Sequence, residues 1–159
     1  MSTIDAPPLT TPVVQGSPPR MLIVRAPYYR GVVDGMTEGA VQLLGAAGAT
    51  HVILDVAGAF ELPQAIRIAL RGRERFDGFV ALGCVVRGET DHYEFICAAT
   101  MQGLMDVALQ FGIALGSGLL TVDTLAQAEA RSGGRDNKGA EAAAAALRQV
   151  DAARRLGAV

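Results

Sequence analysis

The segment that decides the fold is FVALGCVV, residues Phe79–Val86, a near-continuous apolar run in the middle of the chain. A strand covered on both faces has this composition, because neither side of it meets water. Gly88 ends the run, and a helical pattern follows from His92 to Phe111. The segment therefore predicts a central strand of a parallel sheet, followed by a helix that crosses to the next strand.

Similar strand–helix pairs lie on both sides of this segment. Further strands are predicted at Met21–Arg25, His51–Val56 and Ile113–Thr121, and further helices at about Arg30–Ala47, Pro63–Arg71, Thr124–Arg131 and Asn137–Arg155. Alternation of strands and helices is typical of a parallel sheet with helices on both faces. The predicted fold is α/β, a three-layer α/β/α sandwich around a four-stranded parallel, flavodoxin-like sheet.

Local signals refine this outline. Five prolines within residues 1–20 exclude a helix there, so we predict a flexible N-terminal arm at 1–20 and a single domain at 21–159. Asp91 and Glu94 have the spacing of a capping box at the start of the 92–111 helix. Gly116 and Gly118 predict that the fourth strand is irregular.

Composition excludes several classes of protein. The 14 Lys and Arg residues against 16 Asp and Glu residues give a net charge of −2, which argues against a nucleic-acid partner. No apolar run reaches the roughly 20 residues of a membrane helix, and residues 1–20 lack the pattern of a signal peptide. Cys84 and Cys97 lack the spacing and the His or Cys neighbours of a zinc site. We therefore expect a cytoplasmic protein with reduced thiols and no metal.

The alanine-rich, aromatic-poor composition also bears on assembly. Aromatic residues make up 5% of the 159 residues and Trp is absent, so a single domain has a thin core. Chains of this kind often gain stability from partner subunits. We expect an oligomer.

In an open parallel sheet, ligands bind beside the carboxyl ends of the strands. The segments at these ends are 27–29, 58–61 and 87–92. His92 is the candidate for proton transfer, because imidazole titrates near neutral pH and this residue begins a helix at the ligand edge. The other histidine, His51, begins a strand at the opposite edge and is interpreted as a surface residue.

Other residues at this edge have both a functional and a structural interpretation. Gly88, Glu89 and Thr90 lead into a helix N-terminus that attracts phosphate, or they form a turn and a cap. Tyr28 and Phe60 are exposed rings for stacking on a heterocycle, or core and interface anchors. Glu61 accepts hydrogen bonds from ligand hydroxyls or caps its own helix.

Four blocks in this order resemble 6,7-dimethyl-8-ribityllumazine synthases, and the resemblance extends from Met21 to about Leu147. The blocks are VAGAFELP (Val56–Pro63), ALGCVVRGETDHY (Ala81–Tyr93), GLLTVDT (Gly118–Thr124) with Gln127-Ala128, and Asn137-Lys138-Gly139. The resemblance implies the penultimate step of riboflavin biosynthesis. In that step 5-amino-6-(D-ribitylamino)uracil condenses with 3,4-dihydroxy-2-butanone 4-phosphate, phosphate leaves, and no cofactor or metal takes part.

The resemblance also implies a set of site residues. His92 is the general acid and base, and Tyr28 stands where the family stacks a Phe on the uracil ring. The remaining pyrimidine-side residues are Ala59, Phe60, Glu61, Cys84, Val85, Val86 and Ser117, and the phosphate-side residues are Glu89, Thr90, Arg131 and Lys138.

Arg131 raises a topological question. It lies near the C-terminal end of a predicted helix that leads away from the ligand edge, so we expect it at the opposite edge, out of reach of Thr90 within one chain. The resemblance implies that a neighbouring subunit supplies it, because family active sites lie between adjacent subunits of a pentamer. Free pentamers, decamers and a 60-subunit shell all stay open. Riboflavin synthase is a further candidate partner.

Three positions depart from the family pattern: Ala57 replaces a Pro, Pro27 replaces a polar or basic residue, and Ser117 replaces an aromatic ring. These changes bear on substrate affinity. They also leave a second function open, a catalytically weak paralogue that binds lumazine or flavin or serves as an assembly module. The retained His92, Thr90 and Arg131 favour the enzyme.

Overall fold

The four apolar runs form one parallel sheet in the computed structural model, which describes residues 8–158. Its strands are β1 (Arg20–Arg25), β2 (Thr50–Asp55), β3 (Gly78–Val86) and β4 (Ala114–Val122), in the spatial order β2-β1-β3-β4. β3 is buried from Gly78 to Cys84, as its composition predicts for an inner strand. The predicted fold class is confirmed.

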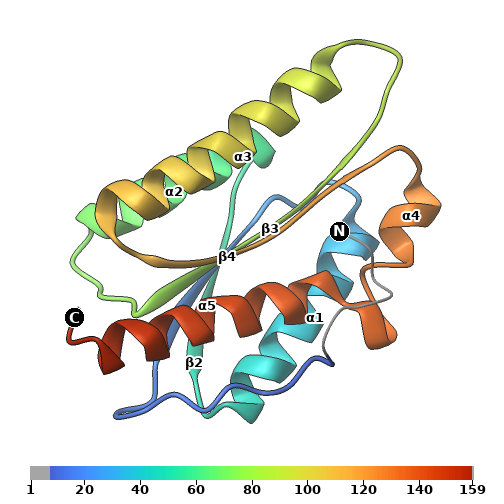
Figure 1. Ribbon diagram of the computed structural model, residues 1–159. Helices are drawn as coiled ribbons and strands as arrows, with labels where there is room; N and C mark the ends of the chain where they lie inside the picture. The colour runs from blue at the N-terminus through green and yellow to red at the C-terminus, as the bar shows by residue number, and fades with distance from the viewer. Residues whose placement is uncertain (1–7, 159) are drawn as a thin grey trace.

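Helices cover both faces of the sheet (Figure 1). α1 (Arg30–Ala46) and α5 (Lys138–Arg155) lie on one face, and α2 (Leu62–Arg71) and α3 (His92–Phe111) lie on the other. A five-residue helix, α4 (Leu125–Glu129), follows β4, and two short 3₁₀ helices span Ala59–Glu61 and Gly134–Asp136. This is the predicted three-layer sandwich.

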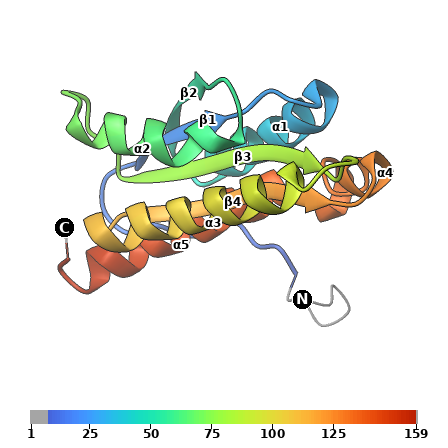
Figure 2. The ribbon, with the colours of Figure 1, turned by 90° about the horizontal axis from the view of Figure 1, so that it is seen from above.

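The order of the strands marks where a ligand site belongs. The chain leaves β1 toward β2 on one face and leaves β3 toward β4 on the other, so the connections diverge between β1 and β3. Such a switch point opens a crevice at the carboxyl ends of the two strands. Figure 2 shows α4 and the first turn of α3 at the end of the molecule toward which β3 points.

β4 differs from the prediction of an irregular strand. It is continuous over nine residues and pairs in register with β3 from Ala114 to Val122. Its glycines instead allow α5 to lie close to the sheet: a Cβ on Gly116 would stand 1.9 Å from the carbonyl oxygen of Ala142. The same close approach occurs between helices, since a Cβ on Gly139 would stand 1.9 Å from the carbonyl oxygen of Met36.

The predicted capping box of α3 is also wrong. Asp91 has helical dihedral angles (φ −67°, ψ −4°) and makes no side-chain cap bond, and Glu94 pairs with Arg87 instead. A capping box does form at α4, where the Thr124 side chain accepts from the backbone N–H of Gln127 and the Gln127 side chain accepts from the backbone N–H of Thr124.

Part of the predicted arm contacts its own chain. The backbone N–H of Gln15 donates to Asp151 (3.1 Å), and the Arg154 guanidinium donates to the carbonyl oxygens of Gln15 and Ser17 (2.6 and 2.7 Å). Residues 1–7 of the arm lie outside the described residues. Within residues 8–158, no helix has the length and apolar character needed to cross a membrane.

Candidate active site

The segments that follow β1 and β2 meet at the carboxyl edge of the sheet. Tyr28 lies in the turn between β1 and α1 with 64% of its surface exposed. A Cβ built on Gly58 would stand 3.9 Å from the Tyr28 ring and 3.2 Å from a Glu61 carboxylate oxygen. The structure therefore brings the Tyr28 ring and the Glu61 carboxylate together around Gly58, where a Cβ would crowd the carboxylate.

The short 3₁₀ helix presents the rest of this segment. Ala59 packs against the α2–α3 core, whereas Phe60 is half-exposed. The Phe60 carbonyl oxygen accepts a hydrogen bond from the Gln64 side chain in α2 (3.2 Å). Tyr28 and Phe60, each more than half exposed, thus both present a ring at this edge.

The last three residues of β3 are also candidate site residues. Cys84, Val85 and Val86 pair in register with Leu120, Thr121 and Val122 of β4. Cys84 is 4% exposed, and burial raises the pKa of its thiol to about 11, so the thiol stays protonated at neutral pH. This thiol is therefore a weak nucleophile. The groups that the segment 84–86 can offer to a ligand are its backbone N–H and C=O groups and its small apolar side chains.

Arg87, directly after β3, organises the turn that carries His92. Its guanidinium donates to Glu94 (2.6 Å) and to Asp123 (2.9 Å) and lies 4.2 Å from the centre of the Tyr93 ring. Hydrogen bonds to the two carboxylates raise the pKa of Arg87 above its ordinary value. Arg87 thus links the end of β4 to both residues that follow His92, a role that sequence reasoning missed.

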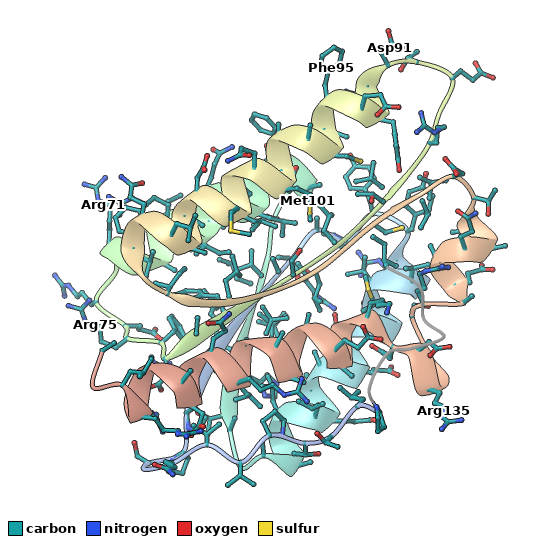
Figure 3. The ribbon with its side chains drawn as sticks, in the orientation of Figure 1. Arg71, Arg75, Asp91, Phe95, Met101 and Arg135 are labelled. Atoms are coloured by element: carbon teal, nitrogen blue, oxygen red, sulfur yellow. The ribbon has the colours of Figure 1, made fainter. Side chains whose placement is uncertain are left out.

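His92 itself is the first residue of α3 and is exposed. Glu89, Thr90 and Asp91, which precede it, are exposed as well. Figure 3 shows Asp91 and Phe95 at the outer end of α3, with Arg71 and Arg75 at the other end of the molecule. An exposed imidazole at a helix N-terminus is accessible to a ligand at the carboxyl edge.

Arg131 and Lys138 lie at the carboxyl end of β4, so the prediction that Arg131 lies at the opposite edge is wrong. Helix α4 ends after five residues, and the Arg131 carbonyl oxygen accepts from the backbone N–H of Lys138 at the start of α5 (2.9 Å). Its guanidinium donates to the Gln127 carbonyl oxygen (2.8 Å), and Lys138 pairs with Glu141 (2.7 Å).

These two cations nevertheless lie on the opposite face of the sheet from the helix that begins with His92. α4 and α5 pack into the core on the α1 side, whereas α3, which begins with His92, packs on the α2 side. The two faces of the sheet therefore separate two sets of site residues in one chain: Glu89, Thr90 and His92 at the start of α3, and the Arg131–Lys138 pair on the α5 side.

Ser117 belongs to neither set. It lies in the middle of β4, paired in register with Ala81 three residues before Cys84. It is exposed in an apolar groove between α3, β4 and α5, and its hydroxyl lies 4.0 Å from the Met101 sulfur. Figure 3 shows Met101 on the side of α3 that faces the sheet.

Comparison with known proteins matches this chain to one family. Residues 18–154 match the family described as 6,7-dimethyl-8-ribityllumazine synthase, and this range contains every candidate site residue named above. A protein from Nitrobacter winogradskyi with that name is 48% identical over 142 residues, which are 86% of this chain and 87% of the relative. One from Paramagnetospirillum magneticum is 43% identical over 87% of this chain and 97% of the relative, and 6,7-dimethyl-8-ribityllumazine synthase 1 from Rhizobium meliloti is 45% identical over 89% and 95%.

The family match spans the whole sheet and the candidate site. The matched range covers the whole sheet, and the four sequence blocks quoted above lie at the carboxyl ends of its strands and at the start of α5. The chain belongs to the 6,7-dimethyl-8-ribityllumazine synthase family.

Proposed function

We propose that this protein is a transferase that condenses 5-amino-6-(D-ribitylamino)uracil with 3,4-dihydroxy-2-butanone 4-phosphate, the penultimate step of riboflavin biosynthesis. The uracil 5-amino group and the ketone form a Schiff base with loss of water, inorganic phosphate is eliminated, and the ribitylamino nitrogen closes the second ring with loss of a second water. The observation that carries the proposal is the family match over residues 18–154.

The pyrimidine substrate binds at the ends of β1, β2 and β3. Its ring stacks on Tyr28, its ribityl chain lies along Ala59, Phe60 and Glu61, and its polar edge meets the backbone of Cys84, Val85 and Val86. The approach of the Tyr28 ring and the Glu61 carboxylate to Gly58 supports this assignment. A flat ring gains from stacking on an exposed aromatic side chain, and a carboxylate is a suitable acceptor for ribityl hydroxyls.

The phosphate substrate binds beside α3. Glu89 and Thr90 form its loop, and the cations Arg131 and Lys138 neutralise the phosphate. His92 moves protons between the substrates during Schiff-base formation and ring closure. Its exposed position in the first turn of α3 supports this role, and Arg87 holds that turn through its bond to Glu94. Orientation of the two substrates supplies much of the remaining rate.

We further propose that each site is completed by a neighbouring subunit of a pentamer. Arg131 and Lys138 approach the site from the next chain, which accounts for their position on the face opposite α3. Ser117 likewise contacts the pyrimidine substrate across that boundary, through its backbone and hydroxyl. A ring of identical chains needs two different surfaces that fit each other.

Two uncovered apolar surfaces support the ring. On one side, Val52, Ile53 and Leu54 of β2 are between 37% and 41% exposed. On the other, Met105 and Leu109 border the groove between α3, β4 and α5. Burying both removes apolar area that a single chain leaves in water. Sedimentation velocity of the purified protein distinguishes free pentamers from decamers and a 60-subunit shell.

We also propose that the reaction takes place in the cytoplasm, where the charge on the phosphorylated substrate keeps it from crossing a membrane. Riboflavin synthase, which consumes the lumazine product, is the proposed partner.

A direct assay tests the proposed reaction. Purified protein is mixed with both substrates, and the absorbance of the lumazine and the release of phosphate are followed together. We expect one phosphate per lumazine, and neither product when one substrate is omitted. Lumazine formation no faster than the protein-free mixture would exclude the proposed activity.

A further inference from the structure

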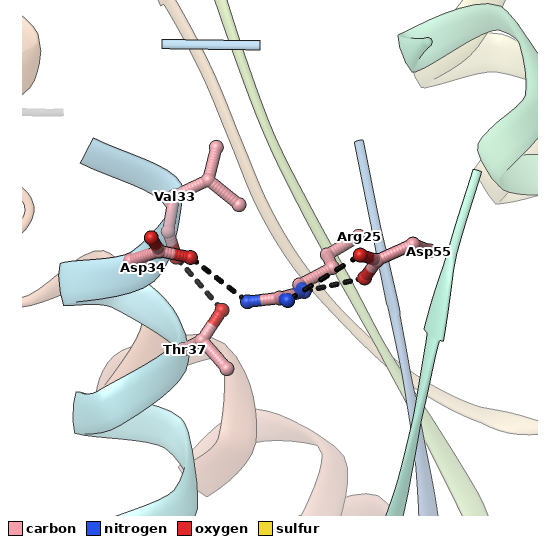
Figure 4. A network of polar contacts seen from close by, with 5 residues as sticks. All are labelled: Arg25, Val33, Asp34, Thr37 and Asp55. Carbon is pink, nitrogen blue, oxygen red and sulfur yellow. Dashed lines mark hydrogen bonds and ion pairs between the residues drawn. The ribbon is translucent and has the colours of Figure 1, made fainter. Parts of the chain in front are cut away.

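A three-residue ionic cluster lies at the base of the proposed pyrimidine site (Figure 4). The Arg25 guanidinium donates to both oxygens of Asp55 (2.5 and 3.4 Å) and to Asp34 (3.0 Å). The side chain of Arg25 is only 18% exposed, although its partners are 43% and 49% exposed. One largely covered arginine therefore bridges two carboxylates from different elements.

The cluster joins the starts of both pyrimidine-binding segments. Arg25 is the last residue of β1 and is paired in register with Asp55, the last residue of β2. The chain continues from Arg25 into the turn that carries Tyr28, and from Asp55 into the segment 56–61. The backbone N–H of Val56 also donates to the Arg25 carbonyl oxygen (2.9 Å), so the two segments leave the sheet side by side.

Asp34, the third member of the cluster, connects the helix after the turn to the strand before it. Asp34 lies in the second turn of α1, so its bond to Arg25 spans residues 26–33. Within this span Tyr29 adopts a left-handed conformation (φ 53°, ψ 57°), and no side chain caps the helix there. A non-glycine residue in this region is strained, and it persists only where its surroundings hold it.

We propose that Arg25 is a positioning residue for the pyrimidine substrate. Its bonds to Asp34 and Asp55 hold the 26–29 turn against the 56–61 segment, so that the Tyr28 ring stands ready beside Gly58 before substrate arrives. Arg25 does not touch the substrate, and the phosphate side of the site lies on other elements. This inference rests on the proposed function.

The alternative is an arginine that only stabilises the fold, and the chain offers a matched control for it. Arg20 lies at the other end of the same strand and pairs with Glu74 (2.5 Å), while its guanidinium lies 4.8 Å from the centre of the Phe76 ring. It is far from the ligand edge. A purely structural role predicts that the two arginines behave alike in the assay.

The experiment compares Arg25→Met, Arg25→Lys and Arg20→Met with the unchanged protein. The KM for each substrate, kcat and the melting temperature are measured, and fluorescence titration gives the Kd for the lumazine product. For Arg25→Met we expect KM for the ribitylaminouracil and Kd for the lumazine to rise about tenfold, because the ring is no longer held in place. The KM for the butanone phosphate stays within about twofold.

Arg25→Lys recovers part of the loss, since an ammonium reaches one carboxylate but not both, and Arg20→Met changes neither KM. If Arg25→Met does not fold, Asp34→Asn and Asp55→Asn each remove one partner and are measured in the same way. Equal changes in both KM values, or a lowered melting temperature with both KM values unchanged, would overturn the proposal. Absence of turnover in the unchanged protein would refute the proposed function instead, and the lumazine titration then decides on Arg25 alone.

Discussion

At the scale of single residues, two arginines at the carboxyl ends of the neighbouring strands β1 and β3 hold the loops of the candidate site. Arg25 ends β1 and bonds to Asp34 and Asp55, while Arg87 follows β3 and bonds to Glu94 and Asp123. Each guanidinium joins two carboxylates, and its planar fork of donors holds them in a more fixed geometry than the rotating donors of an ammonium. The loops at the carboxyl edge thus gain fixed positions that short turns alone do not provide.

The role of His92 leads to a prediction about turnover. We expect His92→Ala to lower kcat by about tenfold to a hundredfold, which is modest for acid–base catalysis because orientation of the substrates is retained. His51→Ala is the matched control, since His51 is an exposed residue of β2 away from the carboxyl edge. The assay is steady-state lumazine synthesis, with sedimentation to check assembly; unchanged kcat in His92→Ala would remove His92 from the mechanism.

The buried thiol of Cys84 leads to a prediction about alkaline stability. Burial raises its pKa from 9.0 to about 11, so between these values the unfolded chain has released a proton that the folded chain keeps. The stabilisation is complete below pH 9 and is lost as the pH rises toward 11, and we expect the free energy of unfolding to fall by about 2–3 kcal/mol over this range. Denaturant unfolding measures it.

Cys84→Ala is the control for that experiment. It lowers stability at every pH because it removes buried atoms, but the decrease between pH 9 and 11 becomes smaller. Burial also raises the pKa of Cys97, so part of the decrease persists in this variant. An identical pH dependence with and without Cys84 would contradict the assignment.

At the scale of elements, small residues determine how α5 is packed. Ala142, Ala143, Ala144 and Ala146 are all buried, and Gly116 and Gly139 allow backbone contact with β4 and α1. Alanine and glycine on these surfaces bring helix and sheet closer than larger side chains permit. The alanine-rich composition therefore allows α5 to pack closely on β4 and α1, in addition to indicating a thin core.

This packing predicts opposite effects for two glycine substitutions. A Cβ on Gly139 would meet the Met36 carbonyl oxygen at 1.9 Å, and backbone cannot move aside without shifting α1 or α5. We expect Gly139→Ala to cost about 3 kcal/mol of stability, at the upper end of the usual range for overpacking, because the clash is with backbone. Gly45→Ala, in α1 with open space around it, should instead stabilise by about 0.5–1 kcal/mol. Denaturant unfolding of both variants measures the difference, and similar values for the two would contradict the close packing.

At the scale of the whole molecule, the chain has apolar surfaces that its own helices do not cover. α3 is 20 residues long but buries only Thr100, Leu104 and Val107, and all six residues of β2 are exposed. An exposed edge strand with the apolar composition of an inner strand favours association with another chain. The two proposed halves of the site, on opposite faces of one sheet, need such a partner to meet.

Mixing two impaired variants tests the shared site. His92→Ala and Arg131→Ala chains are unfolded together, refolded at equal amounts, and compared with each variant refolded alone. If each site takes His92 from one chain and Arg131 from the next, about a quarter of the sites in random rings are intact. Lumazine synthesis should rise accordingly. Activity no greater than the mean of the two single variants, in rings confirmed to be mixed, would contradict sharing.

Local sequence patterns were enough to predict the elements, their order and the edge of the sheet where we propose the site. Helix and strand periodicity follow from which side chains meet water within a few residues, so β3, α3 and the three-layer sandwich were predictable from Phe79–Val86 and its neighbours. The exposed positions of Tyr28 and His92 followed from the rule that ligands bind at strand carboxyl ends.

The long-range partners of charged side chains could not be predicted from the sequence and depend on the folded structure. Glu94 serves Arg87 and not a capping box, Asp55 and Asp34 meet at Arg25, and a short α4 keeps Arg131 at the carboxyl edge. Each of these depends on which residues are brought together from distant parts of the chain. A charged side chain has several acceptable partners by local rules, and the packing of helices on the sheet selects among them.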